Sequence, residues 1–181
     1  MQHEEKKALS DLRIENAKKL LRTSKILIDV DDYKSAANRS YYAIFNAMRA
    51  ELILCDRDYK KHTAVISNFR LKLIKTGVLD KKLSSIIDGL FKVRTDCDYD
   101  DYYIISKEDV TEQVKNAEFF VNAIEEHLKE IDNSDKVAIS KAKKALEEAQ
   151  AQAVKNGTAD MTMDEIDAEI QAYRQEKWEK E

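Results

Sequence analysis

Apolar residues recur at intervals of three and four through residues 1–131, which is the periodicity of helices with one buried face. The pattern predicts five helices, at about 10–27, 33–55, 62–74, 81–94 and 106–131. In the last of them the spacing alternates between four and three from Val110 to Ile131, a heptad seam that packs along a neighbouring helix. An all-α fold, an antiparallel bundle of four to five helices, accounts for this arrangement.

Local signals mark where these helices begin and end. Ser10 is suited to be the N-cap of the first helix, and Ser106 with Asp109 three residues later resembles a capping box. Gly77 is placed to end the third helix, because glycine readily adopts the left-handed conformation that follows many helices. The stretch 95–105 is rich in Asp and Tyr and is interpreted as the frayed end of the fourth helix followed by a loop.

The C-terminal part of the chain differs in composition. A polar break at 132–135 precedes an Ala-, Lys- and Glu-rich helix at 137–154, which Asn156-Gly157 is expected to end. A last helix begins after Thr162, with Glu165 as its capping partner. Its four apolar positions are too few for a helix that is stable alone: Met163, Ile166, Ile170 and Tyr173. We therefore predict two parts, a helical bundle at 1–131 and a charged helical tail at 132–181 that docks through this face on another subunit or a partner, and is otherwise mobile.

Composition narrows the class of protein. The chain has no Pro and three Gly, where average usage gives roughly nine Pro and about a dozen Gly, so uninterrupted helices are expected. Cys55 and Cys97 are not part of a Cys-x-x-Cys or Cys/His pattern, so we predict no metal site, no disulfide and no cofactor. The chain lacks an apolar leader and any run of 18 apolar residues. A soluble cytoplasmic protein without membrane contact is therefore expected.

Charge is distributed unevenly. Residues 1–130 carry 23 Lys and Arg and 23 Asp and Glu, whereas residues 131–181 carry 8 and 12. The excess of acid therefore lies in the tail. A neutral domain with an acidic extension is unlike a general nucleic-acid binder, which has a basic face, so any contact with RNA has to be local.

Three features placed far apart in the chain carry a family resemblance. Arg39 precedes the pair Tyr41-Tyr42 and small residues at helical spacing, His62 follows a short polar loop, and Arg94-Thr95-Asp96-Cys97-Asp98-Tyr99 lies later. Together they resemble the HEPN family of small all-α nucleotide-binding and RNase-related domains, over roughly residues 8–131. The resemblance implies a homodimer with one composite cleft, metal-independent RNA cleavage, and pairing with a nucleotidyltransferase or an antitoxin.

In the HEPN pattern an Arg is followed, after four to six residues, by a His. Arg94 matches the Arg, but Asp98 and Tyr99 stand where the imidazole is expected, and no His occurs between Arg94 and His127. Two functions stay open. Arg94, Asp98 and Tyr99 are catalytic candidates of a toxin or defence protein that acts on RNA. Alternatively, Arg94 and Asp98 form a helix-surface ion pair, and the domain is a non-catalytic module that binds a nucleotide or a protein.

Four further residues are binding candidates. Lys61 and His62 open the third helix, where free backbone N–H groups favour a phosphate, although a solvated helix start with a capping His has the same pattern. Arg39 and Tyr42 lie off the apolar face and are able to grip a phosphate and stack on a base, whereas Tyr41 belongs to the core.

The tail carries a second, shorter resemblance. Residues 156–174 are similar to the C-terminal stretch of small RelB-type antitoxins, through the run Met161-Thr162-Met163-Asp164-Glu165-Ile166 and the later Glu169-Ile170 and Arg174. A stretch this short and helix-friendly also arises by chance. If the relationship is real, it implies a segment that wraps a partner or its own domain.

Overall fold

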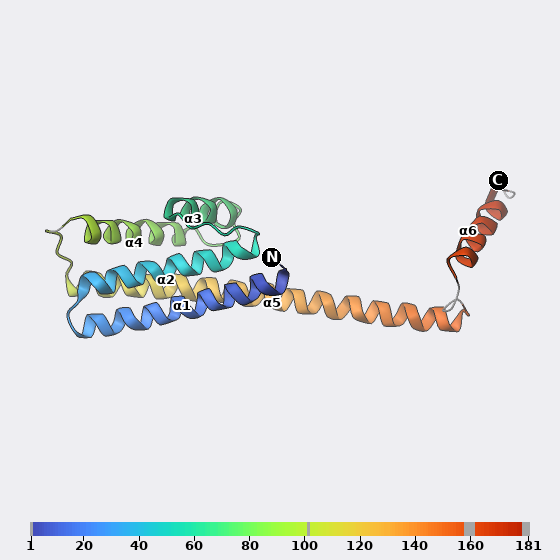
Figure 1. The fold of residues 1–181 in the computed structure, drawn as a ribbon, viewed down its shortest axis with the longest axis horizontal. Helices are drawn as coiled ribbons and strands as arrows, with labels where there is room; N and C mark the ends of the chain where they lie inside the picture. The colour runs from blue at the N-terminus through green and yellow to red at the C-terminus, as the bar shows by residue number, and fades with distance from the viewer. Residues whose placement is uncertain (1, 101, 158–161, 179–181) are drawn as a thin grey trace. The chain divides into compact units, whose positions relative to one another are not determined.

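The regular structure of the chain is helical, as the sequence predicts. The computed structural model describes residues 2–100, 102–157 and 162–178, apart from the side chains at 163, 166, 169, 173 and 175–178. The elements are labelled in Figure 1: α1 (His3–Asp29), α2 (Tyr33–Leu54), α3 (His62–Phe69), the π-helical turn η1 (Arg70–Ile74), α4 (Lys82–Tyr99), α5 (Lys107–Lys155) and α6 (Met163–Trp178). None of the helices described is long and apolar enough to cross a membrane.

The chain divides into two compact units, Met1–Glu130 and Ile131–Glu181. In the first unit α1 and α2 form a hairpin, with α3 and α4 on the other side of α2 (Figure 1). The hairpin turn is specified locally, because Asp31 adopts a positive φ of 59° and the Asp32 side chain accepts a hydrogen bond from the Ser35 N–H at 3.2 Å. Aspartate is suited to both positions, since it tolerates the left-handed conformation and caps helices well.

The core of the first unit is built around α2. Its largest fully buried side chains come from α2, α3, α4 and α5 and include Tyr41, Ile44, Met48, Leu52, Val65, Phe69, Leu83, Ile87, Phe120 and Ile124, while α1 adds Ile14, Ala17 and Leu21. The seam of α5 is also buried, from Val110 to Ile124, and Gln113 donates a hydrogen bond to the Ala37 carbonyl of α2 at 3.2 Å. From Val110 to Ile124 the seam therefore packs within its own domain.

Two helix starts show how tertiary contacts decide local structure. The predicted N-cap at Ser10 is wrong, because α1 begins at His3, where the Glu5 carboxylate accepts a hydrogen bond from the Gln2 N–H at 3.0 Å. Ser10 is buried and donates instead to the Ala50 carbonyl of α2 at 2.9 Å. At α5 the predicted cap is confirmed, since the Ser106 hydroxyl accepts from the Asp109 N–H at 3.0 Å and donates to its carboxylate at 2.7 Å.

Helix ends differ more from the sequence prediction. Gly77 follows η1 with a φ of 79°, as expected of a C-terminal stop. However, α4 continues to Tyr99 instead of fraying after Arg94. The predicted break at 132–135 is also wrong, because α5 runs from Lys107 to Lys155. The stretch 132–135 contains no Gly or Pro, and Lys136 and Asp132 form an ion pair of 2.7 Å one turn apart, which supports a continuous helix.

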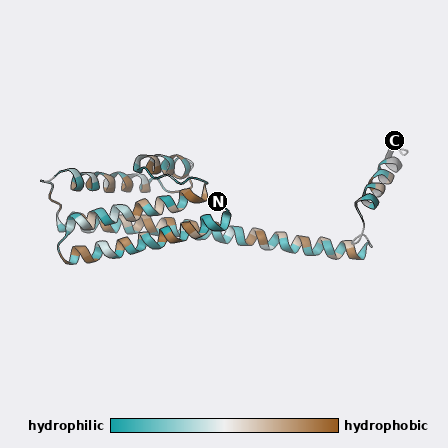
Figure 2. Cartoon of the chain, viewed as in Figure 1, coloured by the Kyte–Doolittle hydropathy of each residue, from teal (hydrophilic) through white to brown (hydrophobic). Residues whose placement is uncertain are grey.

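The second unit is mostly polar along its helices (Figure 2). In its part of α5 the large apolar residues are exposed: Val137, Ile139, Leu146 and Val154. The predicted cap of α6 is present, with the Thr162 hydroxyl donating to the Glu165 carboxylate at 2.9 Å. Of the apolar face predicted for α6, Ile170 is 43% exposed, while the side chains of Met163, Ile166 and Tyr173 lie outside the described residues. Docking of the tail stays a prediction.

Candidate functional site

The longer α4 places Arg94 inside a helix and against α2. Its side chain is 17% exposed, and its guanidinium lies 2.8 Å from the Asp98 carboxylate, one turn further along α4. The guanidinium carbon is 6.0 Å from the centre of the Tyr41 ring and 5.9 Å from that of Tyr99. Arg94 is thus a half-buried cation among aromatic rings. Cation–π attraction to these rings stabilises the charged guanidinium, and the surrounding side chains limit its rotation.

Asp98 is held by both helices. Besides its ion pair with Arg94, its other carboxylate oxygen accepts a hydrogen bond from the Asn38 amide of α2 at 3.1 Å. Asn38 is a site residue that the sequence analysis missed, although its spacing of three and four residues before Tyr41 and Tyr42 places it on their side of α2. Because both oxygens of Asp98 are engaged, this carboxylate orients Arg94 and offsets part of its charge.

His62 enters the same region from α3. Its Nδ1 lies 2.7 Å from the Tyr41 hydroxyl, and its ring stacks on Phe45 with 4.4 Å between ring centres and 19° between planes. The Tyr42 ring meets it edge-on at 5.9 Å. The alternative of a solvated, capping His is therefore wrong, since His62 is half-buried in an aromatic cluster and the N-cap of α3 is Lys61, without a side-chain capping bond.

The electrostatics of this cluster favour a neutral imidazole. Burial lowers the pKa of His62, and the nearby positive charge of Arg94 lowers it further. Burial raises the pKa of Tyr41, with Arg94 opposing that shift, so Tyr41 keeps its proton. A neutral His62 that donates its Nδ1 proton to the Tyr41 oxygen leaves Nε2 free to accept a proton. The Tyr41 phenol and the His62 imidazole are therefore joined by a hydrogen bond next to the positive charge of Arg94.

Arg94 itself stays charged. Burial acts to lower its pKa, but a hydrogen bond with Tyr42, the charge of Asp98 and a hydrogen bond with Tyr99 outweigh burial, and the pKa of Arg94 is raised. Tyr42 and Tyr99 are therefore contacts of the guanidinium as well as aromatic surface. Tyr99 is 77% exposed, so one side of the arginine site opens to solvent.

A second ion cluster holds the loop that leads to His62. One oxygen of Asp58 accepts hydrogen bonds from Arg13 of α1 at 2.7 Å and from Arg49 of α2 at 2.8 Å. Arg13 is buried and also donates to the Arg49 carbonyl at 2.9 Å. Burial acts to raise the pKa of Asp58, but the bonds from Arg49 and Arg13 hold that pKa below its ordinary value. The clamp ties the loop 56–61 to the hairpin, and no local pattern in the sequence signals it.

Comparison with known proteins identifies the family. The sequence model described as "HEPN domain" matches residues 10–127, which is most of the first unit. The chain belongs to the HEPN family.

Its relatives in this comparison include three proteins from two organisms. A "UPF0332 protein" of Thermotoga maritima is 29% identical over 127 residues, 70% of this chain and 96% of the relative. Two proteins of Methanocaldococcus jannaschii are named "Putative toxin MJ0605" and "Putative toxin MJ0142". The first is 34% identical over 65% of this chain and 87% of its own length. The second is 32% identical over 64% of this chain and 78% of its own length.

The structure of this HEPN domain gathers most of the predicted site residues. Arg94 contacts Asp98 and Tyr99 of its own helix and Tyr42 of α2, and His62 of α3 joins them through Tyr41. Lys61 is exposed at the start of α3, beside His62, whereas Arg39 is exposed on α2. No group of three or more His, Cys, Asp and Glu side chains that could bind a metal ion occurs among the described residues. The candidate chemical groups of this site are therefore the Arg94 guanidinium, which can bind an anion, and the His62 imidazole, which can transfer a proton.

Proposed function

We propose that this HEPN domain is a toxin-type protein that acts on RNA at the Arg94 site. The observation that carries the proposal is the contact of both Arg94 and His62 with Tyr41. It supplies an imidazole beside the arginine although the position expected from the family pattern holds Asp98. The two relatives named as toxins support the biological role.

In this proposal each group has one task in metal-independent cleavage. Arg94 binds the phosphate and stabilises the charge that builds on it when the 2′-oxygen bonds to phosphorus. His62, neutral because of its lowered pKa, removes the proton from the 2′-hydroxyl with Nε2, in the tautomer whose Nδ1–H donates to the Tyr41 oxygen. The bond to the 5′-oxygen breaks, and that oxygen takes a proton from solvent. Asp98 orients Arg94 and is a positioning residue, because both of its oxygens are engaged.

A second candidate function rests on that same ion pair. Asp98 neutralises part of the positive charge of Arg94 at 2.8 Å, and this pairing suits a module that binds a nucleotide or a partner protein without cleaving RNA. The nucleotidyltransferase or antitoxin partner that the family implies is compatible with both candidate functions. Growth arrest after induced expression, relieved by the product of a neighbouring gene, is the expected behaviour of the toxin.

The test compares RNA cleavage by the wild type with Arg94→Ala and His62→Gln, in the presence of a chelator. Loss of a preorganised charge donor is expected to slow cleavage by about 100- to 1000-fold in Arg94→Ala. Arg22→Ala, which removes an exposed arginine of α1, is the matched control and should cleave like the wild type. Cleavage that survives in Arg94→Ala, or that disappears with the chelator, overturns the mechanism. Arg94-dependent RNA binding without cleavage supports the second candidate.

The family resemblance also proposes a homodimer with the two Arg94 residues facing a shared groove. The α5 seam is buried inside the domain, so the surface around Tyr99, which is exposed, is the better candidate for the contact between two copies. Light scattering at tens of micromolar protein should give the mass of a dimer. A monomer at that concentration rejects the shared groove.

A further inference from the structure

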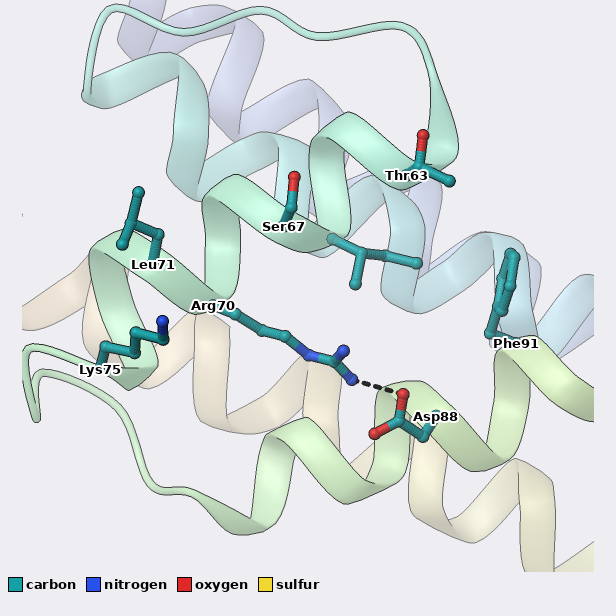
Figure 3. A pocket seen from close by; sticks show the side chains of 8 residues that line it. Thr63, Ser67, Arg70, Leu71, Lys75, Asp88 and Phe91 are labelled. Atoms are coloured by element: carbon teal, nitrogen blue, oxygen red, sulfur yellow. Dashed lines mark ion pairs between the residues drawn. The ribbon is translucent and has the colours of Figure 1, made fainter.

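A pocket of about 460 Å³ opens between α3 and η1 on one side and α4 on the other. Figure 3 shows the Arg70 side chain crossing it toward Asp88, with Lys75 near one end and Phe91 near the other. Thr63 and Ser67 add hydroxyl groups to its lining. The volume lies within the range of small-molecule sites, about 300–1,000 Å³.

The π-helical turn shapes one end of this pocket. The Lys75 N–H donates to the Arg70 carbonyl at 2.8 Å, a bond that spans five residues instead of four. One extra residue in a turn rotates the side chains that follow by about 100°. Ile74, the last residue of this turn, is buried in the core, whereas Lys75, the next residue, is exposed and lines the pocket. Turns of this kind are frequent at functional sites.

The lining combines the groups that recognise a nucleobase. The Arg70 guanidinium lies 2.7 Å from the Asp88 carboxylate and donates to the Ser84 carbonyl at 3.0 Å, so it is held in place. Asp88 is 69% exposed and can still accept hydrogen bonds, while Arg70 retains unused N–H groups. A paired donor and acceptor matches the edge of a base, and the Phe91 ring offers a stacking surface.

The pocket lies beside the Arg94 site. Thr63 directly follows His62 in α3, and the Phe91 ring is 5.8 Å from the Tyr41 ring. Phe91 precedes Arg94 by three residues on α4, a rise of about 4.5 Å. A nucleotide in the pocket therefore adjoins a phosphate bound at Arg94.

We propose that this pocket is a second RNA subsite, which takes the base of a nucleotide next to the phosphate held by Arg94. The proposal rests on the function proposed above, because it requires single-stranded RNA at Arg94. Phe91 and the Arg70–Asp88 pair contact the base, and Lys75 contacts a backbone phosphate. Single-stranded RNA is favoured because its bases are free to enter a pocket and stack on an aromatic ring.

Fluorescence anisotropy with short single-stranded RNA, 2′-O-methylated to prevent cleavage, tests the subsite. Ser67→Trp fills the pocket with a bulky side chain from an exposed position, and Lys75→Glu reverses a charge at its rim. Each is expected to weaken RNA binding by about 5- to 10-fold, the effect of losing one stacked base or one phosphate contact. The matched controls are Asn122→Trp on α5 and Lys19→Glu on α1, both exposed, and these should bind RNA like the wild type.

The possible outcomes separate this inference from the function on which it rests. If Arg94→Ala abolishes RNA binding while Ser67→Trp and Lys75→Glu match their controls, the subsite is wrong and the proposed function stands. If the wild type binds no single-stranded RNA, both proposals fall. A separate experiment titrates free nucleoside monophosphates and follows the NMR signals of Thr63 and Ser67. If these signals shift but Ser67→Trp leaves RNA binding unchanged, the pocket binds free nucleotides and the RNA subsite is overturned.

Discussion

The Asp98 carboxylate lies 2.8 Å from the Arg94 guanidinium, one turn further along α4. Asn38 of α2 donates to the same carboxylate at 3.1 Å, so the pair bridges two helices. An ion pair on a free helix surface would leave both side chains mobile. Here the contact with α2 fixes the arginine in one orientation, which is what a group that binds a phosphate needs.

Replacing Asp98 by Asn tests whether this carboxylate restrains Arg94. The amide keeps a hydrogen bond to the arginine but removes the negative charge that competes with a phosphate. RNA affinity is expected to rise by about two- to fivefold, the scale of a partly exposed ion pair. Anisotropy with the same 2′-O-methylated RNA measures it. Glu126→Gln on α5 removes one exposed negative charge elsewhere, and an equal gain in that control would mean that only net charge matters.

His127 and Glu51 give the domain a pH-dependent contact between α5 and α2. Glu51 is buried, and its carboxylate lies 2.7 Å from Nδ1 of His127. This hydrogen bond raises the pKa of His127, although burial acts against it. The stabilising contribution is therefore complete below the unfolded pKa of about 6.5 and is lost as the pH rises through the higher folded pKa.

His127→Gln should reveal this dependence in urea unfolding. The variant is expected to lose about 1 kcal/mol more of its unfolding free energy at about pH 6 than at about pH 9, because only the protonated imidazole pairs with Glu51. His3→Gln, near the N-terminus and exposed, is the control. A loss that is equal at both pH values, or larger at the higher one, contradicts the charged pair.

Two glycines should respond in opposite ways to alanine. Gly77 has a φ of 79°, which an L-residue with a side chain adopts at a cost, so Gly77→Ala is expected to destabilise the domain by about 1 kcal/mol. Gly89 is exposed within α4, and a Cβ there meets nothing within 4 Å. Gly89→Ala is expected to stabilise by roughly 0.5–1 kcal/mol, the difference in helix propensity. Thermal and urea unfolding measure both changes in stability. Changes of the same sign in Gly77→Ala and Gly89→Ala would refute this prediction.

Deleting residues 135–181 tests the independence of the first unit. Among the described residues Ile124 is the last fully buried apolar residue of α5, Leu128 is partly buried against the core, and residues 133–152 of this helix are exposed. The truncated protein is expected to remain folded with a melting temperature within a few degrees of the full chain. Partner binding or assembly should change if the tail docks. An insoluble or unfolded product would show that the tail contributes to the core.

Local sequence signals determined the helices wherever the decisive interaction lies within a few residues. The caps at Ser106 and Thr162 and the stop at Gly77 are local, and each is present in the structure. The start of α1 is different. Ser10 has a side chain suited to cap a helix, but its hydroxyl donates a hydrogen bond to the Ala50 carbonyl of α2. That contact joins residues forty positions apart, which no local pattern encodes.

For the candidate site, the sequence alone determined the residue types and the family, through Arg94, Asp98 and Tyr99 and the Tyr41-Tyr42 pair. It did not place His62, because the spacing of a helix start cannot tell a solvated imidazole from one stacked on Phe45. Only the packing of α3 against α2 brings His62 to Tyr41, and only the packing of α4 brings Arg94 there. The helices are specified by short-range periodicity, whereas the juxtaposition of their side chains depends on long-range burial, which the folded domain alone decides.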